Sequence, residues 1–300
     1  MAGNLKEVRE RIGSVMNTQQ ITKAMKMVSA AKLRRAQTAI QQMRPYADKL
    51  NSMLRNILSN LEGDADTVFG QQRTIDHACL LVVTSNRGLC GAFNTNIIKE
   101  AIKEIEGNFQ EAYNAGKLTI IFIGKRGYDF LKKRYPKASI VSDYVDLFDD
   151  LNYDKVVAIA KSLMSDFEGN KFDSIKVAYG RFKNAAVQYP EVEQWLPVAP
   201  LEMDESAGDS SLKADYLFEP NKVQLLNHLV PSILQTTLYK YLLDTHASEH
   251  GARMTAMDAA TENANELLRD LRISYNKARQ EAITTEILEI VSGAAALESE

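Results

Sequence analysis

Both ends of the chain repeat apolar residues at steps that alternate between three and four. In the N-terminal segment the clearest part of this stripe runs through Leu33, Ala36, Ile40, Met43, Ala47, Leu50, Leu54, Ile57 and Leu61. Such spacing is the heptad pattern of a coiled coil, whose stripe must be buried against another helix. Asn4 and Glu7 fit a capping box at the start, and the stripe continues unchanged past Pro45. The pattern predicts one helix over residues 1–62, kinked rather than ended at Pro45.

A shorter stripe of the same kind precedes Leu33. It consists of Leu5, Val8, Ile12 and Val15, and it stops near Gln19–Gln20. A break in a heptad stripe changes which face of a helix is buried. We therefore expect the buried face to shift at this point.

The C-terminal segment mirrors the first. Its stripe consists of Met254, Met257, Thr261, Ala264, Leu268, Leu271, Tyr275, Ala278 and Ala282, followed by Ile283, Ile287, Ile290, Ala294 and Leu297. These steps predict a second helix over residues 221–298, with a kink at Pro231. Neither helix can hide its stripe alone, so the two are expected to pair as an antiparallel coiled coil.

The two predicted helices differ in length. At 1.5 Å per residue they span about 87 Å and about 115 Å. If both leave the same middle domain, the second helix overhangs the first by roughly 28 Å at its C-terminal tip. Because the tip still carries an apolar stripe, we expect a protein other than this chain to cover it.

Charge is unevenly distributed along the chain. Residues 1–60 carry a net charge of +8, residues 61–220 of −7 and residues 221–300 of −4. A basic segment this localised predicts an acidic partner, either nucleic acid or an acidic protein surface.

The middle of the chain, residues 74–200, reads as a Rossmann-like α/β domain. Apolar runs at 77–84 and 118–123 are typical of buried parallel strands, and helical stretches follow near 94–106, 128–134 and 154–166. Strands near 174–182 and 186–196 predict a closing hairpin. The remaining segment, 201–220, contains an acidic polar loop at 202–215, predicted to be mobile.

Three short motifs resemble sites of chemistry without completing one. The turn SNRGLCGAFN at 85–94 and the turn IGKRG at 123–127 lack the glycine spacing and the trailing Ser/Thr of nucleotide loops. The histidines of His246-Ala-Ser-Glu249-His250 fit a zinc-peptidase pattern, but such a site needs a third ligand and a pocket. We read that motif as a solvated helix face, and we expect no catalytic residue, cofactor or metal.

No stretch of the chain approaches the roughly 20 apolar residues of a membrane helix. The two cysteines, Cys79 and Cys90, are too few for a disulfide framework. These features predict a soluble chain in a reducing compartment.

Two stretches are unusual for helices, polar and small where a seam should be: NTQQITKAMKMVSAAKLR at 17–34 and YNKARQEAITTEILEIVSGAAAL at 275–297. Together with RGLCGAFN at 87–94, they closely resemble the gamma subunit family of bacterial F-type ATP synthases over the whole chain. The resemblance implies a non-catalytic central-stalk rotor that couples ion flow through the membrane sector to ATP synthesis or hydrolysis. The implied partners are the alpha and beta subunits, the epsilon subunit and the membrane c-ring, with no nucleic acid. The implied location is peripheral, on the cytoplasmic side of the bacterial plasma membrane.

The resemblance also assigns residues. It implies an interface with the alpha–beta ring at Lys23, Met25, Lys26, Arg87, Cys90, Arg253, Gln280, Thr284, Glu286 and Glu289. It implies a foot on the c-ring and the epsilon subunit at Tyr216, Leu217, Phe218 and Glu219. From the residues alone, three alternatives stay open: a static coiled-coil scaffold, a nucleotide-binding α/β enzyme with a helical arm, and a zinc peptidase.

Overall fold

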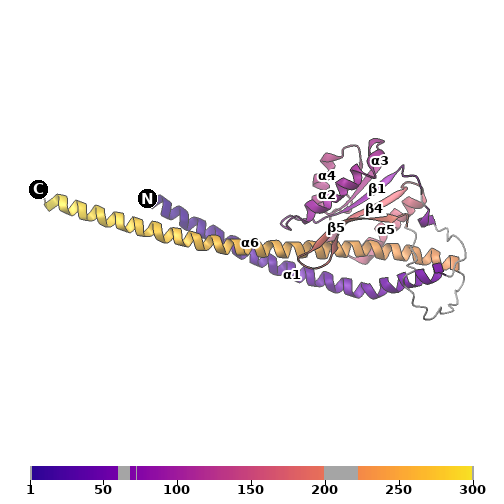
Figure 1. The fold of residues 1–300 in the computed structure, drawn as a ribbon, viewed down its shortest axis with the longest axis horizontal. Helices are drawn as coiled ribbons and strands as arrows, with labels where there is room; N and C mark the ends of the chain where they lie inside the picture. The colour runs from indigo at the N-terminus through magenta and orange to yellow at the C-terminus, as the bar shows by residue number, and fades with distance from the viewer. Residues whose placement is uncertain (1, 60–67, 72, 199–221, 299–300) are drawn as a thin grey trace. The chain divides into compact units, whose positions relative to one another are not determined.

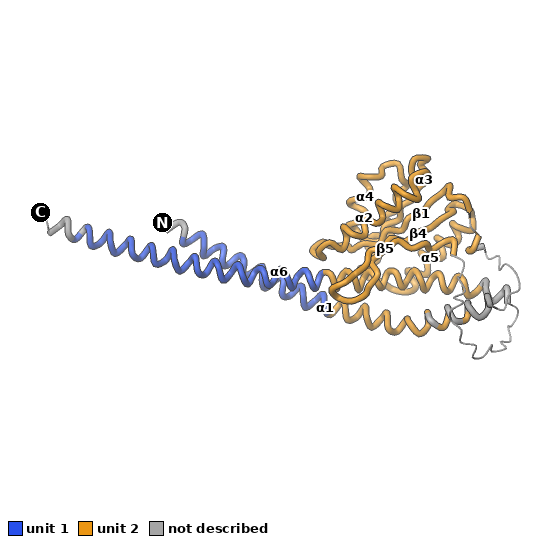
Figure 2. The backbone as a smooth tube through the Cα atoms, in the orientation of Figure 1, with its two compact units in different colours: residues 1–30, 253–300 blue, residues 31–252 orange. Residues whose placement is uncertain are grey.

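The structure is a computed structural model that describes residues 2–59, 68–71, 73–198 and 222–298. The chain divides into two compact units, one formed by residues 1–30 with 253–300 and the other by residues 31–252 (Figure 2). The acidic loop at 202–215 and the foot at Tyr216, Leu217, Phe218 and Glu219 lie outside the described residues.

Two long helices contribute to both units. Helix α1 spans Ala2–Ser59 and contains Pro45, and helix α6 spans Lys222–Glu298 and contains Pro231 (Figure 1). In the first unit the two helices run antiparallel. Arg9 hydrogen-bonds Tyr275 and Lys26 hydrogen-bonds Asp258, so a higher residue number on α1 pairs with a lower residue number on α6. The predicted antiparallel pair is confirmed.

The buried stripe of α1 does not change register at Gln19–Gln20, so that prediction was wrong. Steps of three and four lead without a break from Val15 through Gln19, Thr22, Lys26 and Ser29 to Leu33. Thr22 and Ser29 are buried, and Gln19 and Lys26 are partly buried. The stripe was missed because these seam positions carry polar side chains.

The second unit contains a five-stranded sheet in the order β3-β2-β1-β4-β5. Strands β1 (Ala78–Val83), β2 (Leu118–Ile123), β3 (Ser139–Val141) and β4 (Ser174–Phe182) are parallel, and β5 (Gln188–Leu196) pairs antiparallel with β4. The α/β class and the closing hairpin are confirmed. Strand β3 was not predicted, since three half-exposed edge residues leave no periodic signal.

Helices cover both faces of this sheet. Helices α2 (Phe93–Glu106), α3 (Gln110–Asn114) and α4 (Lys125–Arg134) share a core with Leu80 and Val82 of β1. Helix α5 (Tyr153–Glu168) and the α6 residues Leu234, Leu238 and Leu242 pack on the opposite face, with Leu81 and Val83. Alternate residues of one strand therefore serve two cores, and α6 forms part of the domain as well as part of the helix pair.

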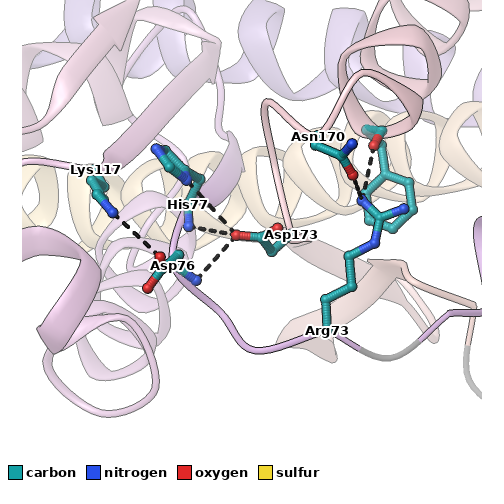
Figure 3. Close-up of polar contacts among 7 residues, drawn as sticks. Arg73, Asp76, His77, Lys117, Asn170 and Asp173 are labelled. Atoms are coloured by element: carbon teal, nitrogen blue, oxygen red, sulfur yellow. Dashed lines mark hydrogen bonds and ion pairs between the residues drawn. The ribbon is translucent and has the colours of Figure 1, made fainter.

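Asp173 organises the amino ends of the parallel strands (Figure 3). Its carboxylate accepts the backbone N–H groups of Asp76 (3.1 Å) and His77 (2.8 Å), just before β1. Nearby, the Arg73 guanidinium donates to the Phe167 carbonyl (3.3 Å) and to Asn170 Oδ1 (2.5 Å), where α5 ends. The Asp173 bonds fix the backbone where it enters β1, at the centre of the sheet. The Arg73 cation satisfies a carbonyl at the C-terminus of α5.

A cluster of acids and tyrosines joins α6 to β5. Glu193 accepts hydrogen bonds from the Tyr179 and Tyr241 hydroxyls, both 2.6 Å long. One turn along α6, Asp244 is 7% exposed, and burial raises its pKa to about 6, against the opposing effect of Lys240 and Arg44. Glu193 adds to that rise and Arg181 opposes it.

The raised pKa of Asp244 makes the free energy of unfolding depend on pH. Because the folded chain holds this proton more tightly than the unfolded chain, stability is lost as pH rises from about 4, the ordinary value, through about 6. Asp244→Asn is therefore expected to stabilise the chain at pH 7.5, on the order of 2 kcal/mol, and hardly at pH 4. Urea unfolding at both pH values measures this, with Asp150→Asn, an exposed carboxylate, as control. Equal effects of Asp244→Asn at both pH values would contradict the prediction.

Position 180 in β4 has no room for a side chain larger than that of glycine. A Cβ added there would lie 2.7 Å from Phe93 Cε2 and 3.4 Å from Ile97 Cδ1. We expect Gly180→Ala to lower the free energy of unfolding by about 1–3 kcal/mol through overpacking. Gly13→Ala, in α1 with nothing within 4 Å of the new Cβ, should instead stabilise by about 0.5–1 kcal/mol. Thermal unfolding of both variants measures these changes. If Gly180→Ala left the stability unchanged, the overpacking would be refuted.

Candidate functional site

The helix pair of the first unit is joined by polar side chains where a coiled coil normally has apolar ones. The Thr261 hydroxyl donates to Thr22 Oγ1 (2.8 Å), which donates to the Gln19 carbonyl (3.0 Å). Gln19 also hydrogen-bonds Asn265 across the pair. Polar pairs in a helix seam favour one register of the two helices, because a shift separates the partners.

Charge at this surface is partly neutralised within the chain. Lys26 forms an ion pair with Asp258, with the two side chains 40% and 59% exposed. Its neighbour Lys23 is exposed and Met25 is half-buried. Asp258 was not predicted as part of the site. The antiparallel register would have found it, because it places 258 opposite 26.

The C-terminal end of α6 continues past α1. Arg9 Nη2 donates to the Tyr275 hydroxyl (2.9 Å), and the same register brings Ala2, the first residue of α1, level with Ala282. The following stretch to Glu298 is about 24 Å long. It exposes five large apolar residues, each 48–66% accessible: Ile283, Ile287, Leu288, Ile290 and Val291. The predicted apolar overhang is confirmed.

The remaining predicted contacts on α6 fall into two environments. Gln280, Thr284, Glu286 and Glu289 are exposed near the overhang, and the Thr284 hydroxyl donates to the Gln280 carbonyl (2.9 Å). Arg253, in contrast, is only 7% exposed. The first four side chains are thus presented on the surface of one helix end, whereas Arg253 is held inside the fold.

The turn SNRGLCGAFN, in the second unit, is held in shape by its own hydrogen bonds. Asn94 Oδ1 accepts the Ser85 backbone N–H (2.9 Å), and Asn94 Nδ2 donates to Ser85 Oγ (2.8 Å) and Cys90 Sγ (3.2 Å). Arg87 is exposed, but Cys90 is only 1% exposed. Cys90, which the resemblance implies at the alpha–beta interface, is buried because its thiol faces the Asn94 side chain inside the turn.

The tip of this turn is an apolar residue that the sequence analysis did not single out. Leu89 is 65% exposed and has a φ of +64°, in the left-handed region that costs a leucine energy. A large apolar side chain held outward by a strained turn is typical of a contact residue. No sequence signal marked Leu89, since a leucine that follows a glycine in a turn reads as an ordinary turn residue.

The His246, Glu249 and His250 motif does not lie on a solvated helix face, so that interpretation was wrong. Glu249 and His250 are 7% and 5% exposed, and His246 stacks on Phe148 at 5.7 Å. Burial, with Lys32 nearby, lowers the pKa of His246 to about 4. Within the described ranges, no group of three or more His, Cys, Asp or Glu side chains is placed to hold a metal ion.

The helix pair predicts two couplings that respond differently to salt. Double-mutant cycles should give about 0.5–1.5 kcal/mol for Thr22 with Thr261, and about 0.2–1 kcal/mol for Lys26 with Asp258. High salt should reduce only the second, because it screens exposed charges and not a neutral hydrogen bond. Urea unfolding at low and high salt tests this. One cycle uses Thr22→Val and Thr261→Val, and the other uses Lys26→Met and Asp258→Asn. A salt-sensitive threonine coupling would contradict it.

Comparison with known proteins places the chain in one family. Residues 4–297 match a family model described as ATP synthase. The ATP synthase gamma chain of Cytophaga hutchinsonii is 49% identical over 98% of this chain and 99% of its own length, and that of Flavobacterium psychrophilum is 50% identical over the same shares.

Solved structures have the same fold. A chain of the Euglena gracilis mitochondrial ATP synthase (OSCP/F1/c-ring) has a TM-score of 0.68 and 24% identity, covering 100% of this chain and 96% of that one. A chain in the rotor of the same enzyme has a TM-score of 0.62 and 23% identity, covering 94% and 100%. In the part of the chain that the structure describes, no helix has the length and apolar character to cross a membrane. By its sequence over nearly its whole length, the chain belongs to the gamma-chain family of ATP synthases, a family of non-catalytic subunits.

Proposed function

We propose that this chain is the central-stalk rotor of a membrane-bound F-type ATP synthase. In that role it couples ion flow through the membrane sector to ATP synthesis or hydrolysis at the alpha–beta ring. The observation that carries the proposal is the overhang of α6, whose five exposed apolar side chains need a cover that α1 does not supply. A ring of partner subunits around the tip would supply it.

The proposed mechanism is allosteric. A helix pair that is different on each side presents different residues to each partner subunit, and it thereby favours a different conformation in each. Turning the pair exchanges those preferences, so ATP binding and release follow its orientation. The polar seam at Thr22 and Thr261 supports this role, because it keeps the two helices in one register under load.

The contact surfaces are part of the proposal. Lys23, Met25 and Lys26 would face an acidic loop of the beta subunit, and Arg87 would contact beta from the turn whose tip is Leu89. Cys90 would act there by holding the turn, given its burial. The proposed polar contacts with the ring are Gln280, Thr284, Glu286 and Glu289. Arg253 would act at this interface from inside the fold, given its burial.

The location follows from the partners. The foot at Tyr216, Leu217, Phe218 and Glu219 is proposed to stand on the c-ring beside the epsilon subunit. The chain would then lie on the cytoplasmic side of the bacterial plasma membrane, held there by other subunits. A static scaffold would have the same location, so a test of function must measure turnover.

The test is assembly and turnover with the alpha, beta and epsilon subunits of the same enzyme. The unaltered chain should co-purify with the ring, and Ile287→Asp with Ile290→Asp should reduce assembly or ATP turnover, because charges enter an apolar sleeve. Gln280→Ala should lower turnover by about fivefold, the effect of one hydrogen bond of about 1 kcal/mol. Ile75→Asp, a partly exposed isoleucine of the α/β domain, is the control.

Two results would reject the rotor. One is a chain that binds no alpha–beta ring. The other is a complex whose turnover is indifferent both to the tip substitutions and to Gln280→Ala, which a static scaffold predicts.

A further inference from the structure

Gly180 has backbone groups that its neighbouring strands do not serve. The pairing of β4 with β1 ends at Ala178, which lies opposite Val82. On the other side, the residue opposite Gly180 is Pro190 of β5, which has no N–H to donate. Gly180 is buried, so its N–H and C=O need partners from elsewhere in the fold.

Helix α6 provides both partners. The Gly180 N–H donates to Thr245 Oγ1 (3.2 Å), and the Ser248 hydroxyl donates to the Gly180 carbonyl (3.0 Å). The Thr245 hydroxyl itself donates to the Tyr241 carbonyl (2.8 Å), which leaves its oxygen free to accept. Thr245 and Ser248 are fully buried. Two side chains of a helix thus take the place of the missing strand.

The helix and the sheet approach each other closely around this point. A Cβ on Gly251 would lie 3.2 Å from both Cα and O of Ala185, in the turn between β4 and β5. Nearer the N-terminal end of α6, the Leu234 carbonyl accepts a hydrogen bond from Trp195 Nε1 (3.0 Å). Polar bonds therefore join the domain to one face of α6 from Leu234 to Ser248, over about 21 Å.

Directional hydrogen bonds add to the apolar packing between α6 and the sheet. The driving force of apolar burial resists separation of a helix from a sheet, but it is itself non-directional. Hydrogen bonds weaken steeply when their angle or length changes. A pair that grips both the donor and the acceptor of one glycine fixes the helix along its axis and around it.

We propose that Thr245 and Ser248 are positioning residues that lock the α/β domain to α6, so that torque on the domain is passed to the helix without slip. The inference rests on the proposed rotor function and names the connection through which that rotor transmits force. It concerns contacts within the second unit, and the bonds at Gly180 are its geometric basis.

The test uses the complete enzyme in vesicles, with this chain as its only altered subunit. The variant combines Thr245→Val and Ser248→Ala, which remove both hydroxyls with little change in volume. The matched control combines Thr236→Val and Ser232→Ala, whose hydroxyls donate only to carbonyls of their own helix, at 2.8 and 3.0 Å. A second control, Thr245→Ser with Ser248→Thr, keeps both hydroxyls.

The measured quantity is the ratio of ATP-driven ion uptake to ATP hydrolysis. We expect the Thr245→Val, Ser248→Ala enzyme to keep hydrolysing ATP while this ratio falls, and both controls to keep the ratio of the unaltered enzyme. In the isolated full chain, hydrogen exchange at the Gly180 amide should accelerate about tenfold in the same variant, since a buried bond is lost.

Two outcomes would overturn the inference: an unchanged ratio, which includes uptake and hydrolysis falling in the same proportion, or Gly180 exchange unchanged from the control. If the double variant does not assemble, Ser248→Ala alone decides by the same ratio. An unaltered enzyme that does not couple hydrolysis to ion uptake would refute the rotor function itself, which separates the two failures.

Discussion

The packing of helix α6 against the sheet is the contact on which the rest of the second unit depends. Between Tyr241 and His250 almost every residue of this helix is buried, so the helix cannot show a one-sided apolar stripe there. Small and hydroxyl side chains such as Ala247 and Ser248 allow the close approach. From Met257 onward, burial contracts to single positions at steps of three and four. One continuous helix therefore changes from a core element to half of a coiled coil.

Much of this architecture could be predicted because its signals are periodic. The heptad steps of the terminal segments and the apolar runs at 77–84 and 118–123 each specify which face is buried. Length alone predicted the overhang, since the two helices pair from a common origin. The candidate contact residues came from the family resemblance and not from any periodic pattern.

What the sequence did not reveal has a common physical cause. The polar seam at Gln19, Thr22 and Lys26 looked like a break, because its partners lie more than 200 positions away in the chain. The helix face of Glu249 and His250 was read as solvated although both residues are buried. Polar side chains are assigned to the surface by default, and only a three-dimensional partner makes them interior. Strand β3 was not predicted for a different reason, because three residues are too few to show a pattern.

The ion pair of Lys26 with Asp258 has a consequence for any surface that must move past its partners. A strongly basic helix facing an acidic loop would rest in a deep electrostatic well, and each well would act as a brake. Because Asp258 neutralises Lys26, and because both side chains remain solvated, the contribution of this lysine to such an attraction is small and screened by salt. In a rotor, an ion pair of this kind would lower the electrostatic friction between the turning helix and its neighbours.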